Sequence, residues 1–238
     1  MRQCLHARGW LSRGLAAAWL AAALPAYAAF GISDASGYLT VDTGAGLVFK
    51  LNKSNGDITS MTLNGGAELL GQTKGSHISS GLGAAVSYQL SASGTSALIT
   101  LSASPVTHYL AVRRNENIIY MATHITAQPS VGELRWISRL SKSVFTGVPT
   151  ASNHTGNTGA IESTDVVGMS DGSTRSKYYG NQRAKELTVG GVTGSGVGVF
   201  LAYGNRESSS GGPFFRDIQF KTDSDVELTQ YMNSGHNQ

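Results

Sequence analysis

The chain has 238 residues, of which 40% are hydrophobic and only 14% are charged, and its formal net charge is +3. This length is sufficient to bury a core of ordinary size, and the single cysteine, Cys4, excludes a framework of internal disulfides. So small a net charge gives no basis for a nucleic-acid-binding surface.

The first 28 residues have the layout of a cleavable secretory signal peptide. Three arginines lie within the first 13 residues, an apolar run covers residues 15–24, and Ala26-Tyr27-Ala28 is typical of a cleavage site. A membrane anchor is the alternative, but the run is shorter than the roughly 20 residues of a spanning helix. We therefore expect a secreted, extracellular protein that begins near Ala29 and has no membrane association. In that protein, 15 basic residues balance 15 acidic ones.

Period-two alternation of apolar and polar residues dominates the rest of the chain, and helical periodicity is scarce. Turn-forming runs such as Asn55-Gly56 and Asn64-Gly65-Gly66 separate the alternating segments. Many short strands joined by polar turns indicate an all-β fold, a large antiparallel sandwich. The predicted strands are Leu39–Asp42, Leu47–Leu51, Ile58–Leu63, Ala84–Leu90, Ala97–Ser102, His108–Arg113, Ile118–Thr126, Leu134–Leu140, Val197–Tyr203 and Val226–Met232.

The stretch from Thr146 to Gly196 differs from its surroundings because it is rich in Gly, Ser, Thr and Asn. It can be interpreted as a disordered linker or as a long ordered loop that carries functional side chains. The adjacent aromatic residues Tyr178 and Tyr179 favour the ordered loop, since aromatic side chains are uncommon in solvated tethers.

The sequence lacks the catalytic motifs of several other enzyme classes. It contains no Gly-rich phosphate loop, no HExxH and no GxSxG. The spacing of the histidines does not indicate a metal site, and no loop of closely spaced acidic residues indicates calcium. We expect neither a metal nor a cofactor. The histidines beyond the signal peptide are His77, His108, His124, His154 and His236.

Two arginines stand four residues apart in one predicted strand. Alternation in a strand places Arg135, Ile137 and Arg139 on one face and the intervening residues on the other. The rise of about 3.3 Å per residue separates the two arginines by roughly 13 Å. That spacing suits successive acidic sugars, or one carboxylate and a neighbouring hydroxyl group, but two solvated charges on an outward face are an equal alternative.

Several distinctive blocks follow one another along the chain after the signal peptide. They are AFGI, GSHISSGLG, MATHITAQPSVGELRW followed by ISRL, TRSKYY, ESSSGGPF followed by RDI, and YMNSGH. Taken in order, these blocks resemble the N-terminal catalytic domain of rhamnogalacturonan endolyases of polysaccharide lyase family 4. The resemblance covers nearly the whole chain after the signal peptide.

The resemblance implies a galactose mutarotase-like β-super-sandwich at residues 29–238 and cleavage of the rhamnose–galacturonate backbone of pectic rhamnogalacturonan I. It also implies a metal-independent reaction and a truncated chain without the family's immunoglobulin-like and carbohydrate-binding-like domains. We expect a monomer. By motif, Lys177 and His236 match the catalytic positions, Arg135 and Arg139 match the substrate-carboxylate-binding arginines, and Tyr231 matches a cleft tyrosine. The chain departs from the family pattern at Thr229 and Phe215, where the family carries an aromatic residue and a histidine.

The chemistry of β-elimination explains why such residues are needed. Loss of the C5 proton of a galacturonate creates an enolate-like dianion, so a cation such as Arg135 must first neutralise the carboxylate. A neutral Lys177 amine can then remove the proton, and His236 can protonate the leaving O4. The reversed assignment, with His236 as the base, is equally compatible with the sequence.

Two other functions are alternatives to the lyase. A hydrolase would need two facing carboxylates, for which the sequence offers six acidic candidates, but Asp217 after Arg216 is more typical of an ion-pair or turn residue. These candidates are Glu133, Glu162, Asp165, Asp217, Asp223 and Asp225. A non-catalytic pectin-binding sandwich is the second alternative, in which aromatic residues stack on sugars while Arg135 and Arg139 grip carboxylates. The aromatic residues proposed for stacking are Trp136, Tyr178, Tyr179 and Tyr231.

Overall fold

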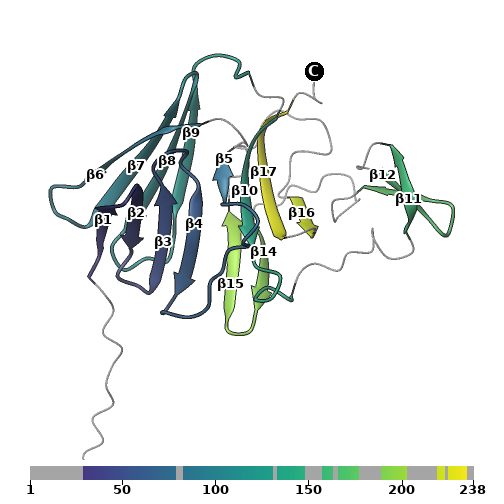
Figure 1. Cartoon of the computed structure of the whole chain (residues 1–238), viewed down its shortest axis with the longest axis horizontal. Helices are drawn as coiled ribbons and strands as arrows, with labels where there is room; N and C mark the ends of the chain where they lie inside the picture. The colour runs from purple at the N-terminus through teal and green to yellow at the C-terminus, as the bar shows by residue number, and fades with distance from the viewer. Residues whose placement is uncertain are drawn as a thin grey trace, which may run out of the picture.

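The computed structural model of the chain describes residues 29–78, 83–130, 133–147, 157–162, 166–176, 189–202, 219–222 and 225–234. Across these ranges the chain forms strands, turns and loops without a helix, and each strand pairing is antiparallel (Figure 1). The all-β prediction is confirmed, and each of the ten predicted strands overlaps an observed one. Consistent with this architecture, the described ranges hold no helix with the length and hydropathy of a membrane span.

The first sheet is a meander in the order β1-β2-β3-β4. Its inner face follows the predicted alternation, since Leu39, Val41, Phe49 and Leu51 are buried while their neighbours are more exposed. The predicted turns also form: Gly56 has a φ of 82°, a conformation that glycine adopts without strain. The strands are β1 (Gly31–Ala35), β2 (Tyr38–Asp42), β3 (Leu47–Asn52) and β4 (Ile58–Leu63).

The second sheet is another meander, in the order β6-β7-β8-β9, and it packs its apolar face towards the first. Ile99, Leu101, Leu110 and Val112 of this sheet are buried in the same core cluster as Phe49. Alternating apolar residues on both sheets therefore build one shared core, as expected for a sandwich. The strands are β6 (Ala85–Leu90), β7 (Ser96–Ala103), β8 (Val106–Arg113) and β9 (Tyr120–Ile125).

The third sheet, in the order β16-β17-β10-β5, brings together strands that are far apart in the sequence (Figure 1). Its contact with the second sheet is centred on Trp136, whose ring stacks on that of His108 with 5.5 Å between ring centroids. Trp136 is 1% exposed, so it anchors the sheet to the core. The strands are β5 (His77–Ile78), β10 (Glu133–Leu140), β16 (Gln219–Thr222) and β17 (Val226–Ser234).

Two smaller sheets lie in the part of the chain that separates β10 from β16. One pairs three strands in the order β11-β12-β13, and Figure 1 shows β11 and β12 to one side of the other sheets. The other is the β14-β15 hairpin, in which Thr193 of β14 forms an isolated β-bridge with Gly147. The Gly- and Ser-rich stretch thus contains ordered strands. These strands are β11 (Asn157–Glu162), β12 (Val166–Met169), β13 (Thr174–Ser176), β14 (Val189–Gly194) and β15 (Val197–Ala202).

Candidate active site

Strand β10 has one face in the core and one face that carries its two arginines. On the core face, the Trp136 indole Nε1 donates a hydrogen bond of 2.8 Å to Ser138 Oγ, and both side chains are buried. Alternation then directs Arg135 and Arg139 to the opposite face, as the sequence predicts. The proposed site is therefore built on the face of the third sheet that points away from the second.

The register of β10 and β17 places two of the matched blocks side by side. Arg135 of the ELRW block lies directly opposite Tyr231 of the YMNSGH block in the antiparallel ladder. The register shifts between Leu134 and Arg135, which indicates a β-bulge at this point. Bulges re-aim side chains and are common beside active sites. The Arg135 side chain is half-buried.

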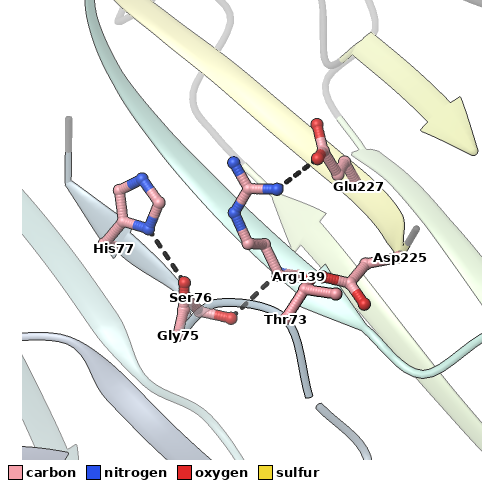
Figure 2. A network of polar contacts seen from close by, with 7 residues as sticks. All are labelled: Thr73, Gly75, Ser76, His77, Arg139, Asp225 and Glu227. Carbon is pink, nitrogen blue, oxygen red and sulfur yellow. Dashed lines mark hydrogen bonds and ion pairs between the residues drawn. The ribbon is translucent and has the colours of Figure 1, made fainter. Parts of the chain in front are cut away.

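Arg139 has a different environment, because its guanidinium forms an ion pair with Glu227 (Figure 2). The two residues lie opposite each other in the same ladder, and their side chains are only 12% and 8% exposed. Screening by solvent is weak at such a position, so the carboxylate compensates the charge of the arginine effectively. The spacing of the two arginines in the sequence gives no reason to assign them different roles. In the structure, Arg139 has Glu227 as an ion-pair partner directly opposite it.

The backbone of Arg139 is held by the segment that leads into β5. Its N–H donates to Ser76 Oγ at 2.9 Å, and its carbonyl accepts from the Gly71 N–H at 3.0 Å. Gly71 is required here because a Cβ would overlap the carboxylate of Asp225, which accepts a hydrogen bond from the Thr73 hydroxyl (Figure 2). These contacts fix the main chain of β10 where the ion pair is formed.

His77 borders the same face, since it lies opposite Ile137 in the ladder between β5 and β10. Its Nδ1 is 2.8 Å from the Gly75 carbonyl oxygen, so Nδ1 carries the hydrogen. Burial lowers the pKa of His77, although the Gly75 hydrogen bond and the nearby Asp57 carboxylate oppose this shift. Burial also raises the pKa of Asp57. The histidine therefore favours the neutral form beside the arginines.

The sequence-predicted site residues fall into two groups. The structure describes Arg135 and Arg139 in full and the backbone position of Tyr231 in β17, whereas Lys177 and His236 lie outside the described residues. Ser176, the residue before Lys177, ends β13.

The pectin-binding alternative assigned Trp136 to stacking on sugars, and this prediction is wrong. Trp136 is buried in the core against His108 and does not offer a surface on which sugars can stack. Sequence reasoning also missed Glu227 and gave His77 no role beside the arginines. Glu227 shares the odd-numbered alternation of Tyr231 in its strand, but only the observed register shows that it faces Arg139.

A cavity of about 840 Å³ lies on the core side of β10, between this sheet and strands β4, β9 and β15. Its lining includes Trp136, Met61, Met121 and Phe200, so it is largely apolar. Such a lining does not suit an acidic sugar, which supports placing the site on the arginine face. In the described ranges, His, Cys, Asp and Glu side chains form no group of three arranged to hold a metal ion.

Comparison with known proteins gives consistent matches. A family model described as "Rhamnogalacturonan lyase B, N-terminal" matches residues 30–238. The chain is 45% identical over 219 residues to "Probable rhamnogalacturonate lyase A" from Neosartorya fischeri, an alignment that covers 90% of this chain and 41% of the relative. It is 42% identical to "Rhamnogalacturonate lyase A" from Emericella nidulans and 40% identical to that from Aspergillus aculeatus, each over 220 residues. These alignments cover 89% of this chain and 40% of each relative. The chain spans about two fifths of the length of these relatives.

Proposed function

Because the chain belongs to the family described as the N-terminal part of rhamnogalacturonan lyase B, we propose that it carries the catalytic centre of a rhamnogalacturonan endolyase. The substrate is pectic rhamnogalacturonan I, and the bond cleaved is the rhamnose-α-(1→4)-galacturonate linkage. The observation that carries this proposal is the pairing of Arg135 with Tyr231 on adjacent strands. It brings two blocks from distant parts of the sequence onto adjacent strands.

We assign the first step to Arg135. The planar guanidinium can donate two parallel hydrogen bonds to the carboxylate of a bound galacturonate. Its positive charge stabilises the extra negative charge that spreads onto the carboxylate when the C5 proton leaves. The half-buried position of Arg135 strengthens this interaction because less water screens it. Tyr231, opposite Arg135 in the ladder, is proposed to line the same cleft.

We assign proton transfer to Lys177 and His236. The lysine amine, kept neutral by desolvation and by the neighbouring arginine charge, takes the C5 proton. The electron pair of the C5–H bond forms the C4–C5 double bond, and the C4–O4 bond breaks. His236 in its protonated form gives a proton to O4, which leaves as the free hydroxyl of rhamnose. In the reversed assignment, His236 takes the C5 proton and Lys177 protonates O4.

We propose that no metal takes part, since Arg135 supplies the positive charge that calcium supplies in other pectic lyases. We further propose that the protein is secreted through the signal-like segment of residues 1–28 and acts outside the cell as a monomer. Pectin is an extracellular polymer, so secretion would bring the enzyme to its substrate.

The decisive experiment is incubation of the purified chain with rhamnogalacturonan I. β-Elimination leaves a C4–C5 double bond conjugated with the carboxylate, and the product absorbs in the ultraviolet, whereas a hydrolase produces no such band. Lys177→Ala is the matched control and should produce no band. Binding of oligosaccharides without any ultraviolet product would refute the lyase and support the non-catalytic pectin-binding sandwich instead.

A further inference from the structure

The second sheet has an open hollow of about 540 Å³, which is within the size range of small-ligand sites. One row of directly paired residues crosses all four strands and lines it: Gln89 on β6, Leu98 on β7, Ala111 on β8 and Tyr120 on β9. Such a row is roughly 14 Å long. Alternation places it on the face opposite to His108, which contacts the third sheet. The hollow is therefore separate from the arginine face of β10.

Tyr120 gives the hollow a positioned aromatic ring. Its side chain is exposed, and its phenolic hydroxyl donates a hydrogen bond of 2.8 Å to Glu116 Oε2. The other oxygen of the same carboxylate lies 3.3 Å from Arg113 Nη1. These contacts fix the outer end of the ring. Ala111, directly opposite Tyr120 in the ladder, has only a methyl group and leaves room beside the ring. A ligand with an apolar face can pack there.

Polar groups surround this apolar floor. Gln89, Ser96 and Arg113 all line the hollow, and the Arg113 side chain is 64% exposed. A guanidinium has five N–H donors, so its contact with Glu116 leaves donors for a ligand oxygen. Sugar rings combine apolar C–H faces with oxygen atoms around their edge. An apolar floor with a polar rim suits them better than it suits a lipid, which needs no hydrogen bonds.

The size of the exposed apolar surface argues against a protein partner. Leu90, Leu98 and Tyr120 are the large exposed apolar side chains in the lining. Together they offer on the order of 200 Å². A stable protein interface needs roughly 800 Å² from each partner. The hollow therefore fits a ligand as narrow as a single polysaccharide chain.

We propose that this hollow is a second polysaccharide-binding site, in which a sugar ring packs against Tyr120 and its oxygen atoms accept hydrogen bonds from Gln89 and Arg113. The identity of the polymer, rhamnogalacturonan, rests on the proposed function. The site holds a part of the polymer other than the one bound at the arginines. It raises the affinity for the polymer because each chain is then held at two places.

The test is retardation in native gels that contain rhamnogalacturonan, with Arg135→Ala as the parent so that binding at the arginines contributes less. Tyr120→Ala should weaken retardation about fivefold, whereas Tyr120→Phe keeps the ring and should bind like the parent. Ala111→Gln fills the floor, leaves the bond between Tyr120 and Glu116 in place, and should weaken binding to a similar extent. Tyr88→Ala is the matched control, because Tyr88 is exposed on the other face of β6. It should change nothing.

Three results would overturn the proposal. In the first, Tyr120→Ala and Ala111→Gln bind the polymer like the parent. In the second, Tyr88→Ala weakens binding equally. In the third, sedimentation shows a dimer that Ala111→Gln dissociates without any change in polymer binding, so that the hollow is an interface between copies. If Tyr120→Ala does not fold, Ala111→Gln decides alone. Ultraviolet product from the wild-type chain tests the lyase separately, and its absence would leave the binding comparison valid.

Discussion

The stability of the fold should fall as the pH is lowered from 7 towards 4, and His108 should cause much of the loss. His108 is 1% exposed, stacks on Trp136 and shares a hydrogen bond of 2.8 Å between its Nδ1 and Thr123 Oγ1. Its Nε2 has no acceptor or donor partner among the described residues. Burial in this setting lowers the pKa of His108 from 6.5 to about 4. Protonation of the folded state is therefore unfavourable.

The sign and size of the effect follow from that shift. The unfolded chain takes up a proton on His108 near pH 6.5, whereas the folded chain does so only near pH 4. Between these values the unfolded state binds more protons, so the free energy of unfolding falls as the pH falls. The slope is about 1.2 kcal/mol per pH unit at its steepest, near pH 5, and the total loss is about 3 kcal/mol when the pH reaches 4. Above pH 7 both states are neutral at this site and the contribution is constant.

Urea unfolding followed by tryptophan fluorescence measures this slope. Trp10 and Trp19 lie in the segment expected to be removed, so in a chain that begins at Ala29 the signal comes from Trp136 alone. His108→Asn keeps a hydrogen-bonding group for Thr123 but removes the titration. The slope between pH 5 and 6.5 should then flatten by about 1 kcal/mol per pH unit, whatever the variant loses in absolute stability.

His124→Asn is the matched control, because His124 is exposed on β9, the strand next to His108. It should leave the slope unchanged. An unchanged slope in His108→Asn, or a value near 6.5 from nuclear magnetic resonance titration of the His108 ring in the folded protein, would refute the reasoning. Either result would mean that the folded protein admits the proton without penalty.

The catalytic assignments lead to other measurable outcomes. Lys177→Ala should abolish formation of the unsaturated product while oligosaccharide binding remains measurable by calorimetry; turnover at the wild-type rate would contradict its role as base. Arg135→Ala should lower kcat/KM by about 100-fold or more, as expected for a group that stabilises developing charge. Arg139→Ala should instead lower the free energy of unfolding by about 3 kcal/mol, because the buried Glu227 carboxylate loses this ion pair; equal and negligible effects of the two substitutions would contradict the distinction between them. An excess of chelator should leave the rate unchanged, and inhibition reversed by calcium would show that a metal neutralises the carboxylate.

Much of the sandwich could be predicted from the sequence because alternation reports burial directly. In β3, for example, Leu47, Phe49 and Leu51 are buried as the pattern requires, and the turn at Gly56 follows from residue chemistry alone. Strands with weak alternation were missed. β5 consists of His77 and Ile78 only, and its existence depends on pairing with β10 and not on its own sequence. Long-range pairing of this kind is not recorded in local periodicity.

The site could be predicted only in part from the sequence, because the pairing register of β10 and β17 cannot be predicted from either strand alone. The alternation of β10 correctly placed Arg135 and Arg139 on one face, because that is a property of one strand. Which residues face them is a property of two strands. The bulge shifts the pairing, so that Leu134 lies opposite Asn233 while Arg135 lies opposite Tyr231. A strict period of two cannot be continued through such a point, and sequence alone does not show where it falls.

Stability alone does not explain the ion pair between Arg139 and Glu227. Replacing a buried ion pair with packed apolar residues of similar size is often neutral or stabilising, because desolvation of the two charges offsets their attraction. The core of this sheet offers such packing one residue away, where Leu140 and Leu228 are fully buried. A fold selected only for stability would have little need of a compensated arginine at this position.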